Sequence, residues 1–100
     1  MDPAIPNIYV SDVVVSTAGR DQGSLYYVIS TEHQFLMLVN GKDRTLDKPK
    51  RKKLRHVQKV LRSETRVAAK LISGDKVLNS ELRRDLAYIA REMQAKNLGG

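Results

Sequence analysis

The sequence predicts a mainly β fold, a small barrel of about five short strands followed by a C-terminal α-helix. Between residues 12 and 61, short β-branched or apolar runs alternate with polar turns, a pattern typical of small barrels. From residue 79 onward the apolar residues recur at helical spacing instead. One hundred residues, 41% of them hydrophobic, suffice for one compact core. We therefore expect a barrel over residues 1–62 and a helical extension over residues 63–100 that packs on it.

The first two strands flank a turn that contains two glycines. Residues 12–16 include three consecutive valines, which suit a half-buried strand, and residues 17–23 form the turn. The second strand covers residues 25–30. Its alternation predicts one face with Leu25, Tyr27 and Ile29 and another with Tyr26 and Val28. We expect the face of Tyr26 to point toward solvent.

An Asn-Gly pair provides the sharpest turn signal in the chain. After a polar turn at residues 31–34, residues 35–39 are apolar on both faces, as in a strand enclosed in a barrel. Asn40-Gly41 suits a type I′ hairpin, so we expect residues 35–39 to pair with residues 42–46. Pro49 and the basic run after it predict an exposed loop at residues 47–53. Residues 54–61 follow as the last strand, with Val57 and Val60 as anchors.

The last third of the chain predicts two helices. Ser63 is a suitable cap for a short helix to about Ser73, and Gly74 is a suitable stop. The final helix has Asn79 or Ser80 as N-cap and Glu81 in its first turn, and ends near Asn97 and Gly99. It carries one apolar stripe, made of Leu82, Leu86, Ile89 and Met93.

Positive charge is concentrated in one stretch of the chain. The net charge is +7, and residues 42–62 carry ten basic and two acidic residues, whereas residues 1–41 contain Arg20 as their single basic residue. Such a concentration favours a polyanionic partner, of which nucleic acid is the commonest, over a face kept basic for solubility. The absence of cysteine excludes disulfides and thiolate sites. We expect no signal peptide and no membrane span, and hence a cytoplasmic location.

Residues 13–23, from Val13 to Gly23, resemble a KOW motif, which consists of a strand, a glycine-containing turn and a second strand. Gly23 stands at the position of the motif's characteristic glycine. Residues 39–44 and 48–57 are similar to the archaeal and eukaryotic large-subunit ribosomal protein family "fourteen-e", and more closely to its short bacterial KOW relatives, known chiefly from Firmicutes. The resemblance covers roughly residues 10–60. It implies an SH3-like barrel that binds RNA, usually ribosomal RNA of the large subunit.

The candidate RNA-binding residues are the cations of the basic stretch and of the KOW turn, because ammonium and guanidinium groups neutralise phosphates. They are Arg20, Lys42, Arg44, Lys48, Lys50, Arg51, Lys52, Lys53, Arg55 and, at the end of the tract, His56. Two readings remain open for Arg20, which either contacts RNA or pairs with Asp21 or Asp12. Likewise His56 either contacts RNA or packs at the barrel rim. The structural turn residues are Gly19, Gly23, Asn40 and Gly41, and we expect Asp21 to brace its turn through a bond to the backbone.

Other polar and aromatic residues have ordinary structural explanations. We expect His33 to be an exposed turn residue and see no metal-ligand spacing for either histidine. For Tyr26, packing is favoured over stacking on a base. Tyr9, Phe35 and Tyr88 are interpreted as core or helix-docking residues. The basic residues of the last helix are interpreted as a solvated face, namely Arg83, Arg84, Arg91 and Lys96.

These observations predict a non-catalytic, ribosome-associated RNA-binding protein that needs no cofactor and is a monomer when free. No nucleophile motif, phosphate-binding loop or dinucleotide pattern points to an enzyme. The alternative is a KOW module that binds a protein, such as a transcription or translation factor. In that case the apolar stripe of the last helix or a barrel edge would make the contact.

Overall fold

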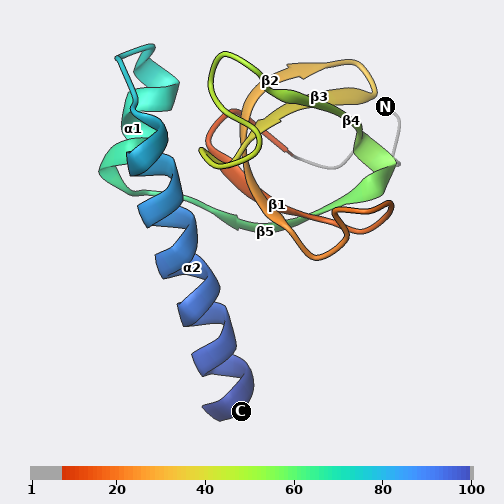
Figure 1. The fold of residues 1–100 in the computed structure, drawn as a ribbon, viewed down its shortest axis with the longest axis vertical. Helices are drawn as coiled ribbons and strands as arrows, with labels where there is room; N and C mark the ends of the chain where they lie inside the picture. The colour runs from red at the N-terminus through yellow and green to blue at the C-terminus, as the bar shows by residue number, and fades with distance from the viewer. Residues whose placement is uncertain (1–7, 100) are drawn as a thin grey trace.

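The computed structural model describes residues 8–99, which form one five-stranded antiparallel sheet and two α-helices (Figure 1). The strand order is β4-β3-β2-β1-β5. The strands are β1 (Asp12–Ser16), β2 (Leu25–Glu32), β3 (Phe35–Val39), β4 (Lys50–Lys53) and β5 (Val57–Arg62). A 3₁₀ helix, Leu54–His56, connects the two edge strands β4 and β5.

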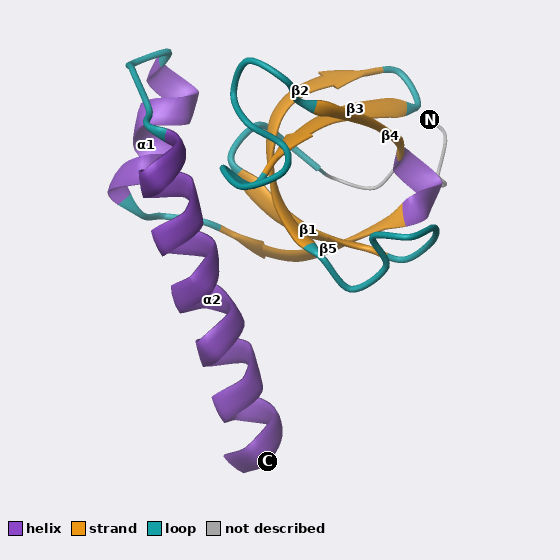
Figure 2. Cartoon of the chain, viewed as in Figure 1, coloured by secondary structure: helices purple, strands orange, loops and turns teal. Residues whose placement is uncertain are grey.

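The sheet is curved into a barrel-like shape without closing into a continuous ladder (Figure 2). The 3₁₀ helix bridges the gap between its edges. The Leu54 N–H donates to the Gln34 carbonyl beside β3, and the His56 carbonyl accepts from the Thr17 N–H at the end of β1, at 2.7 and 2.8 Å. The expected last strand therefore begins at Val57 rather than at residue 54.

Both helices lie on one side of the sheet, and the C-terminal part of α2 extends beyond the strands (Figure 1). α1 covers Arg66–Ser73 and α2 covers Asn79–Gly99. Gly74, at φ 80°, ends α1 as expected. The cap of α1 is Thr65, whose hydroxyl accepts the Ala68 N–H, and not Ser63, because the Ser63 hydroxyl is buried against Tyr27.

The start of α2 also differs from its expected capping. The Glu81 carboxylate accepts the N–H of Leu78, as in half of a capping box. The Asn79 side chain is not a cap, because its carbonyl oxygen accepts the Leu46 N–H from the loop before β4.

Hydrophobic residues are buried on both faces of the sheet. One cluster joins β1, β2 and β3 to both helices and includes Val13, Tyr27, Val39, Leu82, Leu86 and Ile89. The other covers the face turned away from the helices and includes Val14, Tyr26, Val28, Leu36 and Leu38. The expected division of β2 into two faces is therefore correct, but Tyr26 is 1% exposed and does not face solvent.

The predicted strands at residues 12–16 and 35–39 have the expected bounds, whereas β2 is two residues longer than predicted. The turn after β2 needs only His33 and Gln34, because exposed His33 adopts a left-handed conformation at φ 52°.

The predicted pairing of residues 35–39 with residues 42–46 is wrong. β3 pairs with β4 instead, with Leu38 opposite Lys50 and Phe35 opposite Lys53. A type I′ turn needs positive φ at both central residues, but only Gly41 has it, at 77°. The Asn40 side chain accepts the N–H groups of Lys42 and Arg44 and closes a local loop, so residues 40–49 connect the two strands.

The prediction of a loop at residues 47–53 is therefore correct for residues 47–49 and wrong for residues 50–53, which form β4. No helix within residues 8–99 is long and apolar enough to cross a membrane.

Candidate nucleic-acid interface

Strand β4 divides the basic run between the two faces of the sheet. Residues opposite one another in an antiparallel pair project to the same face. Lys50 and Lys52 lie opposite Leu38 and Leu36, on the face turned away from the helices. Arg51 and Lys53 lie opposite Met37 and Phe35 on the outer face. The cations that were predicted to share one exposed loop therefore form two separate sets, one on each face of the sheet.

Asp21 gathers the first set into a polar cluster, which we call the Asp21 cluster: Asp21, Ser16, Tyr26, Lys50 and Lys52. Lys52 is 8% exposed, and its ammonium donates to Asp21 Oδ1 at 2.7 Å and to the Ala18 carbonyl at 2.8 Å. The Tyr26 hydroxyl donates to Asp21 Oδ2 at 2.7 Å, and the Ser16 hydroxyl donates to Oδ1 at 2.9 Å. Lys50 Nζ lies 3.2 Å from Oδ2. The cluster ties the turn at residues 17–23 to β4.

These contacts shift two pKa values. Burial alone would raise the Asp21 pKa, but the hydrogen bonds from Lys52, Tyr26 and Ser16 outweigh it and hold the pKa well below its ordinary value. Burial and the hydrogen bond to Asp21 raise the pKa of Tyr26. Asp21 is thus an anion, and Tyr26 a neutral donor, throughout the physiological range.

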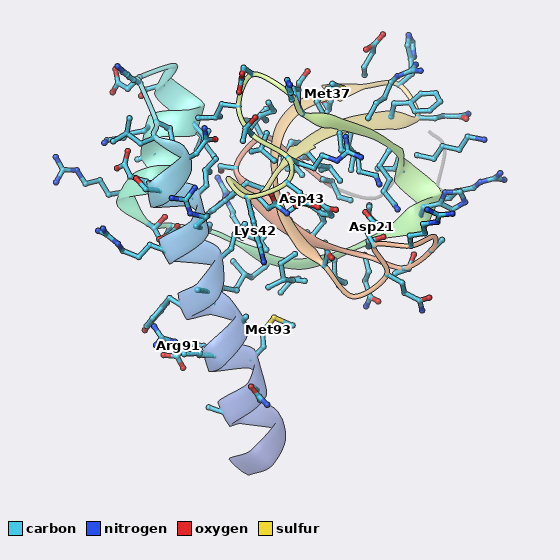
Figure 3. The ribbon with its side chains drawn as sticks, in the orientation of Figure 1. Asp21, Met37, Lys42, Asp43, Arg91 and Met93 are labelled. Carbon is cyan, nitrogen blue, oxygen red and sulfur yellow. The ribbon has the colours of Figure 1, made fainter. Side chains whose placement is uncertain are left out.

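Beside the cluster lies a polar hollow of about 350 Å³, which we call the basic hollow. The turn at residues 17–24 and the loop at residues 40–49 border it, and both Asp21 and Asp43, one from each segment and labelled in Figure 3, line it. Its lining residues are Arg20, Asp21, Ser24, Tyr26, Asp43, Arg44 and Lys50. Three predicted RNA-binding cations, from three separate segments, therefore meet in one place.

Arg20 and Arg44 are the cations of the hollow that remain available. Neither makes a salt bridge or a side-chain hydrogen bond within residues 8–99. The two carboxylates considered as partners of Arg20 are occupied by lysines, Asp21 by Lys52 and Asp12 by Lys59 at 3.1 Å. The ion-pair reading of Arg20 is therefore wrong. Asp43 stays in the hollow as an anion, because its hydrogen bond from Asn40 lowers its pKa.

The other predicted RNA-binding residues do not line the hollow. Lys42 and Lys48 are exposed on the loop, and Arg55 is exposed on the 3₁₀ helix. His56 is half-buried. Arg51 and Lys53 are exposed on the outer face of β4, where the Arg51 guanidinium lies 3.6 Å from the centre of the Phe35 ring. Lys52 is too deeply buried and too firmly bound to Asp21 to contact a ligand, which corrects its assignment to the site.

Helix α2 holds the loop that carries Arg44. Arg83 donates to the Gly41 carbonyl at 2.6 Å, and Asn79 accepts the Leu46 N–H at 3.0 Å. Gly41 packs so closely that a Cβ there would lie 2.2 Å from the Asn79 carbonyl oxygen. Sequence reasoning assigned Arg83 to a solvated face and Asn79 to a helix cap. It missed both contacts because they join positions 42 and 33 residues apart.

The turn glycines have the expected left-handed backbone, at φ 87° for Gly19 and 93° for Gly23. Asp21 braces the turn through side-chain partners rather than through the expected bond to the backbone. Within residues 8–99 no group of three or more histidine, aspartate or glutamate side chains is placed to hold a metal ion.

One of the two surfaces expected for the alternative function, the apolar stripe of α2, is largely covered. Leu82, Leu86 and Ile89 of the α2 stripe are buried against the sheet, and Met93 packs at the edge of the same cluster. The prediction that Tyr9 and Tyr88 lie in the core or at the helix contact is wrong, because their side chains are 60% and 53% exposed. No protein-family model matches the chain, and no curated protein matches it significantly.

Proposed function

We propose that this protein is a non-catalytic RNA-binding protein whose basic hollow takes a backbone phosphate. The observation that carries the proposal is the meeting of Arg20, Arg44 and Lys50 in that hollow. Guanidinium groups fork onto phosphate oxygens, and charge-assisted hydrogen bonds of this kind are the stronger ones. Because Lys50 and Lys52 already balance Asp21, both arginines keep their N–H groups for a ligand.

An SH3-like barrel of the KOW type is the finer fold in this proposal. Support comes from the order of consecutive strands β1 to β4, with β5 returning to pair with β1 after a 3₁₀ helix. Further support comes from the turn that resembles a KOW motif. Gly23 stands at the position of the motif's characteristic glycine and adopts a left-handed backbone conformation, which glycine tolerates best. The choice of large-subunit ribosomal RNA and of ribosome association rests on the resemblance alone.

The exposed cations around the hollow extend the proposed interface. Lys42 and Lys48 lie on the loop that borders it. Each phosphate that these groups neutralise releases counterions, which gives affinity that is independent of sequence and falls steeply with salt. Folded RNA would then be selected by the spacing of its phosphates.

The test is the double variant Arg20→Gln/Arg44→Gln, measured by RNA filter binding over a range of salt concentrations. With about six phosphates contacted, the logarithm of the wild-type affinity should fall with the logarithm of salt at a slope of roughly −4 to −5. Loss of two contacts should make the slope shallower by about 1.5 and weaken binding roughly tenfold at low salt.

The matched control is Arg84→Gln/Arg91→Gln, which removes the same charge from exposed positions on α2. It should keep the wild-type slope. Equal loss in both variants would contradict a role for the hollow and indicate only a general charge effect. A wild-type affinity that does not depend on salt would contradict RNA binding itself and favour a protein partner. Lys52 stays unchanged in these variants, because its loss would leave Asp21 poorly compensated.

A further inference from the structure

A second group of exposed cations, Arg51 and Lys53, lies on the outer face of β4, away from the basic hollow. Arg51 is exposed, and its guanidinium lies 3.6 Å from the centre of the half-buried Phe35 ring. The two residues come from neighbouring strands, in which Met37 lies opposite Arg51 and Lys53 lies opposite Phe35. The Arg51 side chain makes no hydrogen bond or salt bridge within residues 8–99.

This part of the outer face lies beyond the helices. Val39, two residues after Met37 on the same face, is buried in the cluster under the helices, whereas Phe35 and Met37 are only half-buried. Figure 3 shows Met37 at the rim of the sheet, well clear of Met93 and the C-terminal half of α2. A ligand can therefore approach the Arg51–Phe35 pair without displacing a helix.

A guanidinium held over a ring offers two binding surfaces. The planar face turned away from the ring is a platform for an unpaired base, which stacks on arginine planes as it does on aromatic side chains. The N–H groups at its edge are open to a phosphate or a base. Lys53, exposed and opposite Phe35, supplies a charge for the flanking phosphate.

We propose that Arg51, Phe35 and Lys53 bind one unpaired nucleotide, with its base stacked on the Arg51–Phe35 pair and its phosphate at Lys53. This inference rests on the proposed RNA-binding function and specifies its ligand as RNA with a single-stranded segment. Lys50 and Arg51 are adjacent in an edge strand and project to opposite faces. One RNA strand that crosses this edge reaches both the basic hollow and the stacking site.

The experiment compares two RNA probes with equal numbers of phosphates, a decamer of uridines and an abasic decamer of the same length. The wild-type protein should bind the uridine decamer at least about fivefold more tightly, because stacking of one base on such a platform typically contributes that much. Arg51→Lys keeps the positive charge but removes the planar guanidinium group. Phe35→Leu keeps an apolar side chain but removes the aromatic ring. Both variants should bring the ratio of the two affinities close to one, while binding of the abasic decamer stays unchanged.

The matched control is Arg84→Lys, the same substitution at an exposed arginine on α2, and it should keep the wild-type ratio. Circular dichroism verifies the fold of each variant, and Arg51→Lys decides the matter if Phe35→Leu fails to fold. A wild-type ratio in Arg51→Lys would overturn the stacking site.

Two further outcomes separate this inference from the proposed function. If the wild-type protein binds both decamers equally and Arg20→Gln/Arg44→Gln weakens both, the RNA-binding function stands and the stacking site is wrong. If the wild-type protein binds neither decamer nor folded RNA, both proposals are wrong. Deoxyuridine decamers serve as a third probe, and tighter binding of DNA than of RNA would also overturn the assignment to RNA.

Discussion

Asp21 is the residue on which most polar contacts beside the basic hollow depend. It is 14% exposed and accepts hydrogen bonds from Ser16, Tyr26 and Lys52. Asp21→Asn removes the charge that compensates the buried ammonium of Lys52, so we expect the free energy of unfolding to fall by about 3 kcal/mol at pH 7. Urea unfolding followed by circular dichroism measures it.

The loss of stability in Asp21→Asn should become smaller as the pH is lowered. The folded protein holds the Asp21 pKa below its ordinary value. The ionised carboxylate therefore stabilises the fold fully at pH values above the pKa of Asp21 in the unfolded chain, which is near 4. This stabilisation is lost as the pH falls toward the lower pKa that Asp21 has in the folded protein. The difference between wild type and Asp21→Asn should therefore shrink by about 1 kcal/mol between pH 7 and pH 3. Asp43→Asn is the matched control, since Asp43 is an exposed carboxylate of the same hollow, and it should change stability by less than about 0.5 kcal/mol. A pH-independent difference for Asp21→Asn would contradict the assigned ion pair.

At the scale of elements, the loop at residues 40–49 is placed by its contact with the start of α2. Gly41 has a φ of 77°, and a Cβ there would lie 2.2 Å from the Asn79 carbonyl oxygen and 3.0 Å from Leu82. We expect Gly41→Ala to lower the free energy of unfolding by about 3 kcal/mol, from backbone strain together with the forced displacement of the loop. Thermal and urea unfolding measure the loss.

Gly23→Ala separates the two causes. Gly23 has a similar φ, 93°, but a Cβ there meets no heavy atom within 4 Å. Gly23→Ala should therefore lower the free energy of unfolding only by the backbone strain, about 1 kcal/mol. Equal losses for the two variants would show that contact with α2 does not restrain the loop.

The elements also show what local sequence can predict. The three apolar strands and the α2 stripe followed directly from periodicity, because burial on each face leaves a local pattern. β4 left no such pattern, since its lysines are compensated by a carboxylate about thirty residues earlier in the chain. Asn40-Gly41 misled for a similar reason, because Gly41 is required by its approach to Asn79 rather than by a hairpin. The cations of the candidate site could be predicted from the sequence. That Arg20, Arg44 and Lys50 meet in one hollow could not, because it depends on these long-range contacts.

At the scale of the whole molecule, a partly buried hydrogen-bond network joins the sheet to both helices. The Tyr27 hydroxyl from β2 donates to Asp85 of α2 and lies 2.8 Å from the Ser63 hydroxyl, in the segment before α1. Thr65, the cap of α1, also donates to Asp85, at 2.7 Å. Burial, with the hydrogen bond to Asp85, raises the pKa of Tyr27 to about 12, so its hydroxyl remains a donor at physiological pH. The sheet and both helices therefore share polar contacts as well as one hydrophobic cluster.

Tyr27→Phe keeps the ring in that cluster and removes the hydroxyl, leaving the Asp85 carboxylate with one donor fewer. We expect the free energy of unfolding to fall by about 2 kcal/mol, because loss of a hydrogen bond to a half-buried charge costs that much. We also expect a single transition, in which the sheet and the helices unfold together. Far-ultraviolet and near-ultraviolet circular dichroism should report the same urea midpoint. Tyr88→Phe, at an exposed tyrosine of α2, should leave the midpoint unchanged. If helical signal in Tyr27→Phe were lost before the aromatic signal of the sheet, the helices would form a separate unit, and α2 would not hold the Arg44 loop rigidly enough to shape the basic hollow.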